Sequence, residues 1–456
     1  MKKEWENINE NSLQELDKVM TELNNIDYEN QGITWLDEEN HIDEVKFCES
    51  YLQEYDLKCI NGSFFSIDGF VSDGEIEKNI YNIIKNHVAR NVSKKVKQLL
   101  EVLRFESYSE ELPIQNDRIH VKNGTIFLNG MFSGKKEFCL NRLPIKYNPQ
   151  SEQPKVWLAF LEELLEKEDI ITLQEYMGYC LIPSTKGQKM MLLIGKGGEG
   201  KSRVGLVLRS ILGNNMNTSS IQKVETNKFA RADLEYKLLM VDDDMKMEAL
   251  PQTNYIKSIV TLEDKIDLER KSKQSIQGTL YVRFLCFGNG NLNSLYDRSY
   301  GFFRRQIVLT TKEKDKNRKD NPFLIEKLRA EKEGIFLWCL EGLKRLLKND
   351  YEFTISEKAS QNLYHAMEDG NNIISFMKAD DFVKLESATM TTSKKLYGCY
   401  CHWCDENVEK PISAKSFISY LKQSEKEYNI QYSTNILSET GKKSRGFRGI
   451  YIKIRM

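Results

Sequence analysis

Residues 190–202 read MMLLIGKGGEGKS, and this stretch decides the fold of the chain around it. Its five apolar residues, 190–194, are typical of a strand that is buried on both faces of a parallel sheet. An intact G-x-x-x-x-G-K-[ST] pattern follows over residues 195–202, and the apolar-periodic run 204–212 predicts a helix that ends at Gly213. Strand, loop and helix in this order are the context that a phosphate-binding loop requires.

Each part of this loop has a chemical role in holding a nucleotide. The glycines allow the backbone to curl its N–H groups around phosphate oxygens, and the N-terminus of the following helix adds a partial positive charge. Lys201 is expected to reach the β- and γ-phosphates, and the Ser202 hydroxyl is expected to hold Mg²⁺. The residues predicted to contact the nucleotide are Gly195, Gly197, Gly198, Glu199, Gly200, Lys201, Ser202 and Arg203.

Length and composition limit the class of protein. A chain of 456 residues exceeds one hydrophobic core, and 40% hydrophobic with 29% charged residues is the composition of a soluble protein. No apolar run approaches the roughly 20 residues that span a bilayer, and the N-terminus lacks the apolar segment of a secretory signal. Nine cysteines, an odd number, argue against a complete disulfide framework. We therefore expect several domains, a cytoplasmic location and no membrane partner.

Charge is distributed unevenly along the chain. Residues 1–60 carry 5 Lys and Arg against 16 Asp and Glu, whereas residues 394–456 carry 12 basic and 6 acidic side chains. The acidic end indicates a protein partner and the basic end a polyanion, with solvated surface as the alternative for both.

The region before residue 118 is expected to be mainly helical. Its predicted elements include a helix over residues 13–23 and a basic amphipathic helix over residues 74–104. Nothing in it indicates polymerase chemistry, because it has no pair of acidic metal ligands with a partnering His and no zinc-knuckle cysteines. After it, residues 118–128 predict a β-hairpin that turns at Asn123-Gly124, and two helices follow over residues 156–167 and 170–180.

A second buried strand is predicted over residues 237–244 and ends in consecutive carboxylates. Asp242 is assigned to Mg²⁺, held through water, and Asp243 to polarising the attacking water. Acidic runs are usually solvated loop, and that alternative stays open. The four apolar residues before the acids favour a functional strand end.

A third apolar strand, residues 280–287, precedes Asn289, whose amide is expected to orient water or to touch the γ-phosphate. A tight turn is the alternative. Arg304 and Arg305 precede a further strand, and an arginine that projects into the neighbouring subunit stabilises charge on a γ-phosphate. The insertion between the second and third strands contains a cluster of basic side chains, which either contacts DNA or is solvated surface. Its candidate DNA-binding residues are Lys265, Arg270, Lys271 and Lys273.

Together these motifs resemble the superfamily 3 helicases of the phage and plasmid primase-helicase type, a branch of the AAA+ ATPases. The resemblance covers about residues 118–350 and, more weakly, the C-terminus. Besides the phosphate loop, it rests on Lys122-Asn123-Gly124, Asn141-Arg142-Leu143-Pro144, Gly178-Tyr179-Cys180-Leu181, Lys228-Phe229-Ala230, Asp242-Asp243, Gly288-Asn289, Phe303-Arg304-Arg305 and Trp338-Cys339-Leu340-Glu341-Gly342-Leu343.

The resemblance implies a homo-hexameric ring that hydrolyses ATP with Mg²⁺, translocates on DNA and replicates a phage, plasmid or other mobile element. It implies catalytic roles for Lys201, Asp243, Asn289, Arg304 and Arg305. The chain departs from the family at Glu199, where Asn is common, at Asp243, where Glu is commoner, and at residues 290–291, where bulkier residues usually follow. Slower turnover is consistent with these departures. Many relatives carry a primase domain whose signatures are absent here, so no primer synthesis is expected.

Residues 373–456 are predicted to form a separate small domain. Helices over residues 392–407 and 414–423, followed by strands over residues 428–433 and 446–454, have the order of a winged helix, which the resemblance also implies. Its expected DNA contacts, with docking to a protein as the alternative, are Lys415, Lys442, Lys443, Arg445 and Arg448. A zinc site is not expected in this domain. Its candidate ligands lie too close together on one predicted helix to surround a zinc ion; they are Cys399, Cys401, His402 and Cys404.

The predicted fold is multidomain α/β. Its parts are an acidic, mainly helical region (1–117), a β-hairpin with a helical collar (118–185), an AAA+ P-loop motor (186–350), a linker (351–372) and a winged helix (373–456). The predicted function is an ATP-dependent replicative DNA helicase and origin-binding initiator, with single-stranded DNA in the ring and origin duplex on the winged helix. A replication protein is the expected partner of the acidic N-terminus. Two alternatives stay open: a non-motor initiator that uses ATP as an assembly switch, and an AAA+ protein remodeller.

Overall fold

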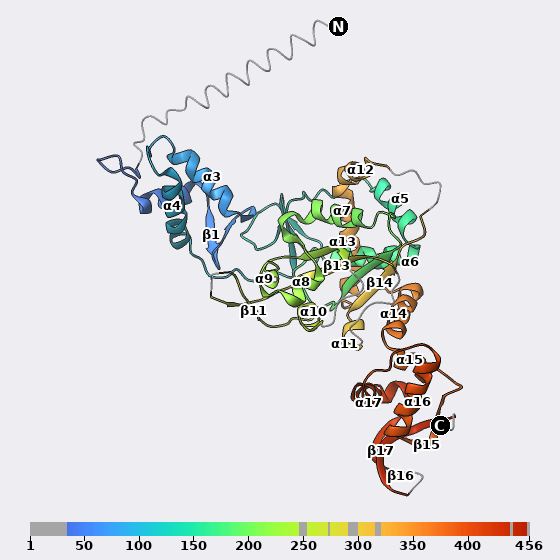
Figure 1. The fold of residues 1–456 in the computed structure, drawn as a ribbon. Helices are drawn as coiled ribbons and strands as arrows, with labels where there is room; N and C mark the ends of the chain where they lie inside the picture. The colour runs from blue at the N-terminus through green and yellow to red at the C-terminus, as the bar shows by residue number, and fades with distance from the viewer. Residues whose placement is uncertain are drawn as a thin grey trace, which may run out of the picture. The chain divides into compact units, whose positions relative to one another are not determined.

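The computed structural model describes residues 34–245, 253–271, 274–290, 300–314, 321–437 and 441–453 (Figure 1). The helix predicted over residues 13–23, Lys273 and Asn291 lie outside the described residues. The chain divides into two compact units, the first comprising residues 1–113 and 137–140 and the second residues 114–136 and 141–456. Within the described residues, every helix is too short or too polar to span a bilayer.

The first unit combines helices with a small antiparallel sheet. Its elements are α2 (Glu44–Glu54), β1 (Leu57–Ile60), β2 (Ser63–Ser66), β3 (Gly69–Val71), α3 (Asp73–Ile84) and α4 (Val92–Glu106), and the sheet order is β1-β2-β3. The prediction of a single helix over residues 74–104 is therefore wrong, because α3 and α4 occupy this stretch as two separate helices. The apolar faces of α3 and α4, which include Ile80 and Leu99, are buried in one core, so the chain must reverse between them. Asn91 adopts a left-handed φ of 57° at that reversal.

A five-stranded, all-parallel sheet forms the centre of the second unit (Figure 1). Its strands are β8 (Met190–Gly195), β9 (Met216–Thr218), β10 (Leu239–Met245), β13 (Arg283–Asn289) and β14 (Gln306–Thr310), in the order β14-β8-β13-β10-β9. The α/β class is thereby confirmed. From β8 the chain runs to the far strand β9, returns through β10 and β13, and then crosses β8 to reach β14. Ligands in open α/β sheets bind beside such a reversal of strand order, outside the carboxyl ends of the strands.

Helices cover both faces of this sheet, which explains why its strands are continuous apolar runs. On one face Leu193 belongs to a core with α7 (Ser202–Leu212), and on the other Leu192 belongs to a core with α8 (Ile221–Thr226) and α10 (Asn254–Val260). The remaining elements of this region are η1 (Gly213–Asn215), α9 (Lys228–Ala232), β11 (Ile266–Leu268), β12 (Ile276–Gly278), α11 (Tyr300–Phe303), α12 (Leu324–Ala330) and α13 (Lys332–Lys348).

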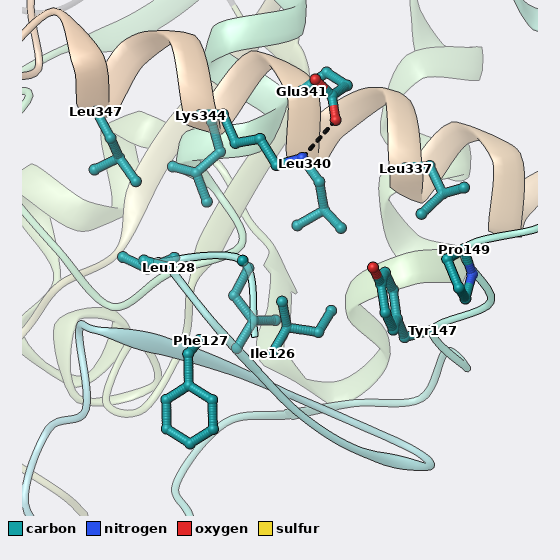
Figure 2. Close-up of a pocket in the computed structure, with 13 residues that line it drawn as sticks. Ile126, Phe127, Leu128, Tyr147, Pro149, Leu337, Leu340, Glu341, Lys344 and Leu347 are labelled. Carbon is teal, nitrogen blue, oxygen red and sulfur yellow. Dashed lines mark hydrogen bonds and ion pairs between the residues drawn. The ribbon is translucent and has the colours of Figure 1, made fainter. Parts of the chain in front are cut away.

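The part of the second unit that precedes the sheet contains the predicted hairpin. Strands β4 (Arg118–Val121) and β5 (Gly124–Phe127) are antiparallel, with Val121 opposite Gly124. The predicted hairpin is therefore confirmed, but its turn residues are Lys122 and Asn123, one position earlier than predicted. The other elements are β6 (Phe132–Ser133), β7 (Arg142–Leu143), α5 (Lys155–Leu164) and α6 (Lys167–Tyr179). A cavity of about 190 Å³ lies between the hairpin region and α13. Figure 2 shows Ile126 and Leu128 facing Leu340 and Leu347 of α13 across it.

Helices α6 and α13 approach closely at two glycines. A Cβ atom on Gly178 would lie 2.4 Å from the carbonyl oxygen of Cys339, and one on Gly342 would lie 2.3 Å from that of Gln174. Both obstacles are backbone atoms, which cannot move aside without separating the helices.

We therefore expect Gly178→Ala to lower the free energy of unfolding by about 1–3 kcal/mol, the usual cost of overpacking a buried contact. Gly134→Ala is the matched control, because a Cβ atom there meets nothing within 4 Å. Thermal unfolding of both variants provides the measurement. Equal melting temperatures would show that the two helices adjust without cost.

Most of the segment predicted as a linker, residues 351–372, is a helix that packs against the sheet. Helix α14 (Glu357–Gly370) lies against β14, where the Asn362 amide donates to Thr310 Oγ1 at 3.1 Å and Leu363 packs against the core. Helix α15 (Asn372–Met377) follows directly. The linker assignment is wrong because these contacts join residues far apart in the sequence, and no local pattern reveals them.

The C-terminal part has the predicted helices and one strand more than predicted. Its elements are β15 (Val383–Thr392), α16 (Ser393–Glu406), α17 (Ala414–Gln423), α18 (Glu425–Tyr428), β16 (Gln431–Leu437) and β17 (Lys443–Ile452), with sheet order β15-β17-β16. Ser413 caps α17, its hydroxyl accepting from the Ser416 amide at 3.2 Å. Tyr400, Phe417 and Phe447 belong to one core that joins both long helices to the sheet.

Candidate nucleotide-binding site

The phosphate loop connects β8 to α7 at the carboxyl end of the sheet, so the predicted order of strand, loop and helix is confirmed. Gly197, Gly198 and Gly200 have φ values of 107°, 81° and 105°, in the region that favours glycine. Gly195 has a different constraint, because a Cβ atom there would lie 2.8 Å from Lys201 Nζ. The glycines therefore let the loop curl and let the lysine fold back across it.

A cavity of about 640 Å³ opens beside this loop, within the range of small-molecule sites. Side chains and backbone from the loop, from the ends of β10 and β13 and from the start of α12 meet there. The lining residues are Gly197, Gly198, Gly200, Lys201, Ser202, Arg203, Asp243, Phe287, Asn289, Asn321, Pro322 and Leu324. Gly195 and Glu199, also predicted to contact the nucleotide, are not among them. A lysine, a hydroxyl, a carboxylate and glycine amides are together a donor set that fits a nucleoside triphosphate with Mg²⁺.

Lys201 lies at the centre of a buried polar cluster. Its Nζ donates to Glu199 Oε2 at 2.8 Å and to Asn289 Oδ1 at 3.0 Å. Burial acts to raise the pKa of Glu199, but the hydrogen bond from Lys201 and those from loop amides outweigh it, and the pKa lies below its ordinary value. The structure thus brings Asn289 into contact with Lys201, although β8 and β13 are far apart in the sequence.

The two consecutive carboxylates at the end of β10 have different environments. Asp242 is buried, and its Oδ2 accepts from the Ile221 amide at the start of α8 at 2.7 Å, while Asp243 lines the cavity with Ser202. Burial raises the pKa of Asp242. Successive residues of a strand point to opposite faces, so only one of the pair can face the loop. The structure therefore places Asp243, together with Ser202, at the cavity, whereas the side chain of Asp242 is turned toward the start of α8.

Arg304 and Arg305 lie at the opposite end of the sheet from the cavity. The neighbouring Gln306 pairs with Met190, at the start of β8, whereas the phosphate loop follows Gly195, about 16 Å further along the strand. Arg305 donates to Thr261 Oγ1 at 3.4 Å and to the Gly301 carbonyl, and burial together with Arg304 lowers its pKa. Neither arginine can reach the phosphate loop of its own chain.

The insertion between β10 and β13 contains an antiparallel pair, β11 and β12. Arg270, a predicted DNA contact, instead pairs with the buried carboxylate of Glu235. Lys265 and Lys271 are exposed. In the C-terminal part, Lys415 on α17 and Lys442, Lys443, Arg445 and Arg448 on the hairpin of β16 and β17 are all exposed.

Four residues that line the cavity were missed by the sequence prediction: Phe287, Asn321, Pro322 and Leu324. Asn321 Oδ1 accepts from the Phe323 amide at 3.0 Å and so shapes the entry into α12. The Asn-Pro pair is a recognisable turn signal, but it does not reveal that the turn faces the phosphate loop.

Comparison with known proteins shows that this chain shares its fold with a protein region of known structure. A family model described as a family of unknown function (DUF5906) matches residues 193–305, which include the phosphate loop, both carboxylates and the paired arginines. No curated protein matches the sequence. The apo structure of the NrS-1 C terminal region (305-718) is similar with a TM-score of 0.54 and 12% identity, covering 89% of this chain and 99% of that chain. The A form apo structure of the same region has a TM-score of 0.50, 12% identity and the same coverage. The chain therefore has a multidomain α/β fold like that of the NrS-1 C-terminal region.

Proposed function

We propose that the chain is an ATP-driven DNA helicase that acts, as a homo-hexamer, in the replication of a phage, plasmid or other mobile element. The observation that carries the proposal is the single cavity into which Lys201, Ser202, Asp243 and Asn289 converge from three strand ends. The similarity in fold to the NrS-1 C-terminal region and the resemblance to superfamily 3 helicases support it. An AAA+ core is part of the same proposal.

Each of the cavity residues would have a separate role in the transfer of a phosphoryl group to water. Lys201 would donate to the β- and γ-phosphates, and loop amides would surround their oxygens. Ser202 and Asp243 would hold Mg²⁺, which neutralises charge on the phosphates. Asn289, which accepts a hydrogen bond from Lys201, would orient the attacking water. Catalysis of this kind consists mainly of positioning and electrostatic stabilisation.

DNA contacts are proposed on two separate surfaces. The exposed Lys265 and Lys271 would face the strand inside a ring, and Lys415 with the basic β16–β17 hairpin would contact duplex phosphates. The order α15, β15, α16, α17, β16, β17 supports the winged-helix assignment, in which the second long helix enters a major groove.

The proposal is tested by ATP-dependent unwinding of a forked duplex, comparing the native protein with Lys201→Ala. Lys344→Ala, which removes an exposed lysine of α13, is the control and should unwind normally. Unwinding that depends on Lys201 supports the motor. Absence of unwinding by the native protein, with DNA still bound, would instead indicate an initiator that uses ATP as an assembly switch. ATP hydrolysis that no DNA stimulates would indicate a protein remodeller.

Arg305→Ala tests the role of the neighbouring subunit. Because Arg305 cannot reach its own phosphate loop, we expect this variant to bind ATP normally and to lose at least about 100-fold in turnover. Mixing it with Lys201→Ala protein provides the measurement, since hexamers that contain both would restore some complete sites. Normal hydrolysis by Arg305→Ala alone would refute the contribution in trans.

A further inference from the structure

Glu199 is an unusual neighbour for a phosphate-binding lysine. Its side chain is 4% exposed, that of Lys201 is 7% exposed, and Glu199 Oε2 accepts from Lys201 Nζ at 2.8 Å. The charge that is expected to hold the terminal phosphates is therefore already matched by a buried carboxylate of the same loop. An ion pair exposed to water would contribute little to stability. This pair is shielded from water, and charges interact more strongly in the protein interior than in water.

We propose that Glu199 is an internal counter-ion that competes with the nucleotide phosphates for Lys201 and thereby sets the affinity for ATP. The inference rests on the proposed nucleotide function of this cavity. Any phosphate oxygen that accepts a hydrogen bond from Lys201 Nζ comes within about 6 Å of Glu199 Oε2, since each bond is close to 3 Å long. A like charge at this distance disfavours binding of an anion.

The two carboxylate oxygens of Glu199 have separable contacts. Oε1 accepts from the amides of Lys196 at 2.6 Å and Gly197 at 2.8 Å and so holds the shape of the loop, whereas Oε2 holds the lysine. Glutamine at this position keeps one oxygen for the two amides and removes the charge. The substitution therefore tests the counter-ion without removing the support of the loop.

The contact between Glu199 and Lys201 would promote release of the product nucleotide. When the terminal phosphate leaves, Glu199 can recapture Lys201, which weakens the hold on the remaining nucleotide. The same exchange costs affinity when ATP enters. Glu199 is thus a positioning residue, acting through Lys201 and not by contact with the phosphates; it is not among the residues that line the cavity.

The test is calorimetric titration of the full-length protein with a non-hydrolysable ATP analogue and with ADP, both with Mg²⁺. Glu199→Gln is expected to bind the ATP analogue about tenfold more tightly than the native protein, and ADP with a smaller gain because ADP carries less negative charge. Glu199→Asp keeps the charge and should show no gain. Glu313→Gln is the matched control, because Glu313 pairs with Lys196 of the same loop but is 80% exposed.

The possible results separate this inference from the proposed function. If the native protein binds the analogue and Glu199→Gln binds it no better, the counter-ion is refuted and the nucleotide site stands. If Glu313→Gln gains as much affinity for the ATP analogue as Glu199→Gln, the gain results from the lower negative charge of the protein near the loop and not from the loss of competition for Lys201. If neither the native protein nor Glu199→Gln binds nucleotide, both proposals fall. Melting temperatures of all variants show whether a loss of binding reflects unfolding.

Discussion

Lys201→Ala is expected to reduce ATP hydrolysis by at least about 100-fold, the loss that follows removal of one donor aimed at developing charge. The buried ammonium group joins the phosphate loop to Asn289 at the end of β13, so its removal takes away both a phosphate ligand and a contact of the residue proposed to orient water. Phosphate release at saturating ATP measures the effect. Hydrolysis within a few fold of native would show that the loop does not act on nucleotides as proposed.

The same substitution has a structural consequence that needs its own control. It leaves the Glu199 carboxylate buried without its lysine, and breaking a buried ion pair in this way costs about 3–5 kcal/mol. The double variant Lys201→Ala/Glu199→Gln removes both charges and should recover most of that stability while remaining inactive. If the double variant regains hydrolysis as well as stability, the defect of the single variant was one of folding.

Asp243→Asn is expected to lower the rate of Mg²⁺-dependent hydrolysis by at least about 100-fold, whereas Asp242→Asn should lose less than about tenfold. Asp243 shares the cavity with Ser202, so removing its charge weakens the proposed hold on the metal. Asp242 instead accepts from the Ile221 amide, and an asparagine oxygen can accept the same bond. Titrating Mg²⁺ at fixed ATP separates a loss of metal affinity from a loss of rate.

One result of this comparison would contradict the proposed role of Asp243 as the metal ligand. If Asp242→Asn is as damaging as Asp243→Asn and both variants melt like the native protein, the buried carboxylate reaches the metal after all. The assignment made from the order of residues alone would then hold. A melting temperature that falls only in Asp242→Asn would place its role in anchoring α8.

Patterns that span a few neighbouring residues were sufficient to predict several elements of this protein. The apolar run before Gly195, the glycines and the helix after Ser202 form a single local unit, and the structure has it at the predicted place. The same holds for the hairpin of β4 and β5, although its turn lies one residue earlier than predicted, and for the helix predicted over residues 414–423, which Ser413 caps. In each case hydrogen bonding and backbone freedom within one turn or strand determine the conformation.

Tertiary structure alone decided which side chains face the cavity. The sequence places Asp242 and Asp243 together, but in the folded chain Asp242 accepts from the Ile221 amide whereas Asp243 lines the cavity. It places Arg305 near Asn289, but the crossing to β14 returns the chain to the other end of the sheet. Residues 357–370 form a helix where a linker was expected, because α14 packs on β14. Local propensity determines the elements, whereas long-range pairing and burial determine which of their faces meet.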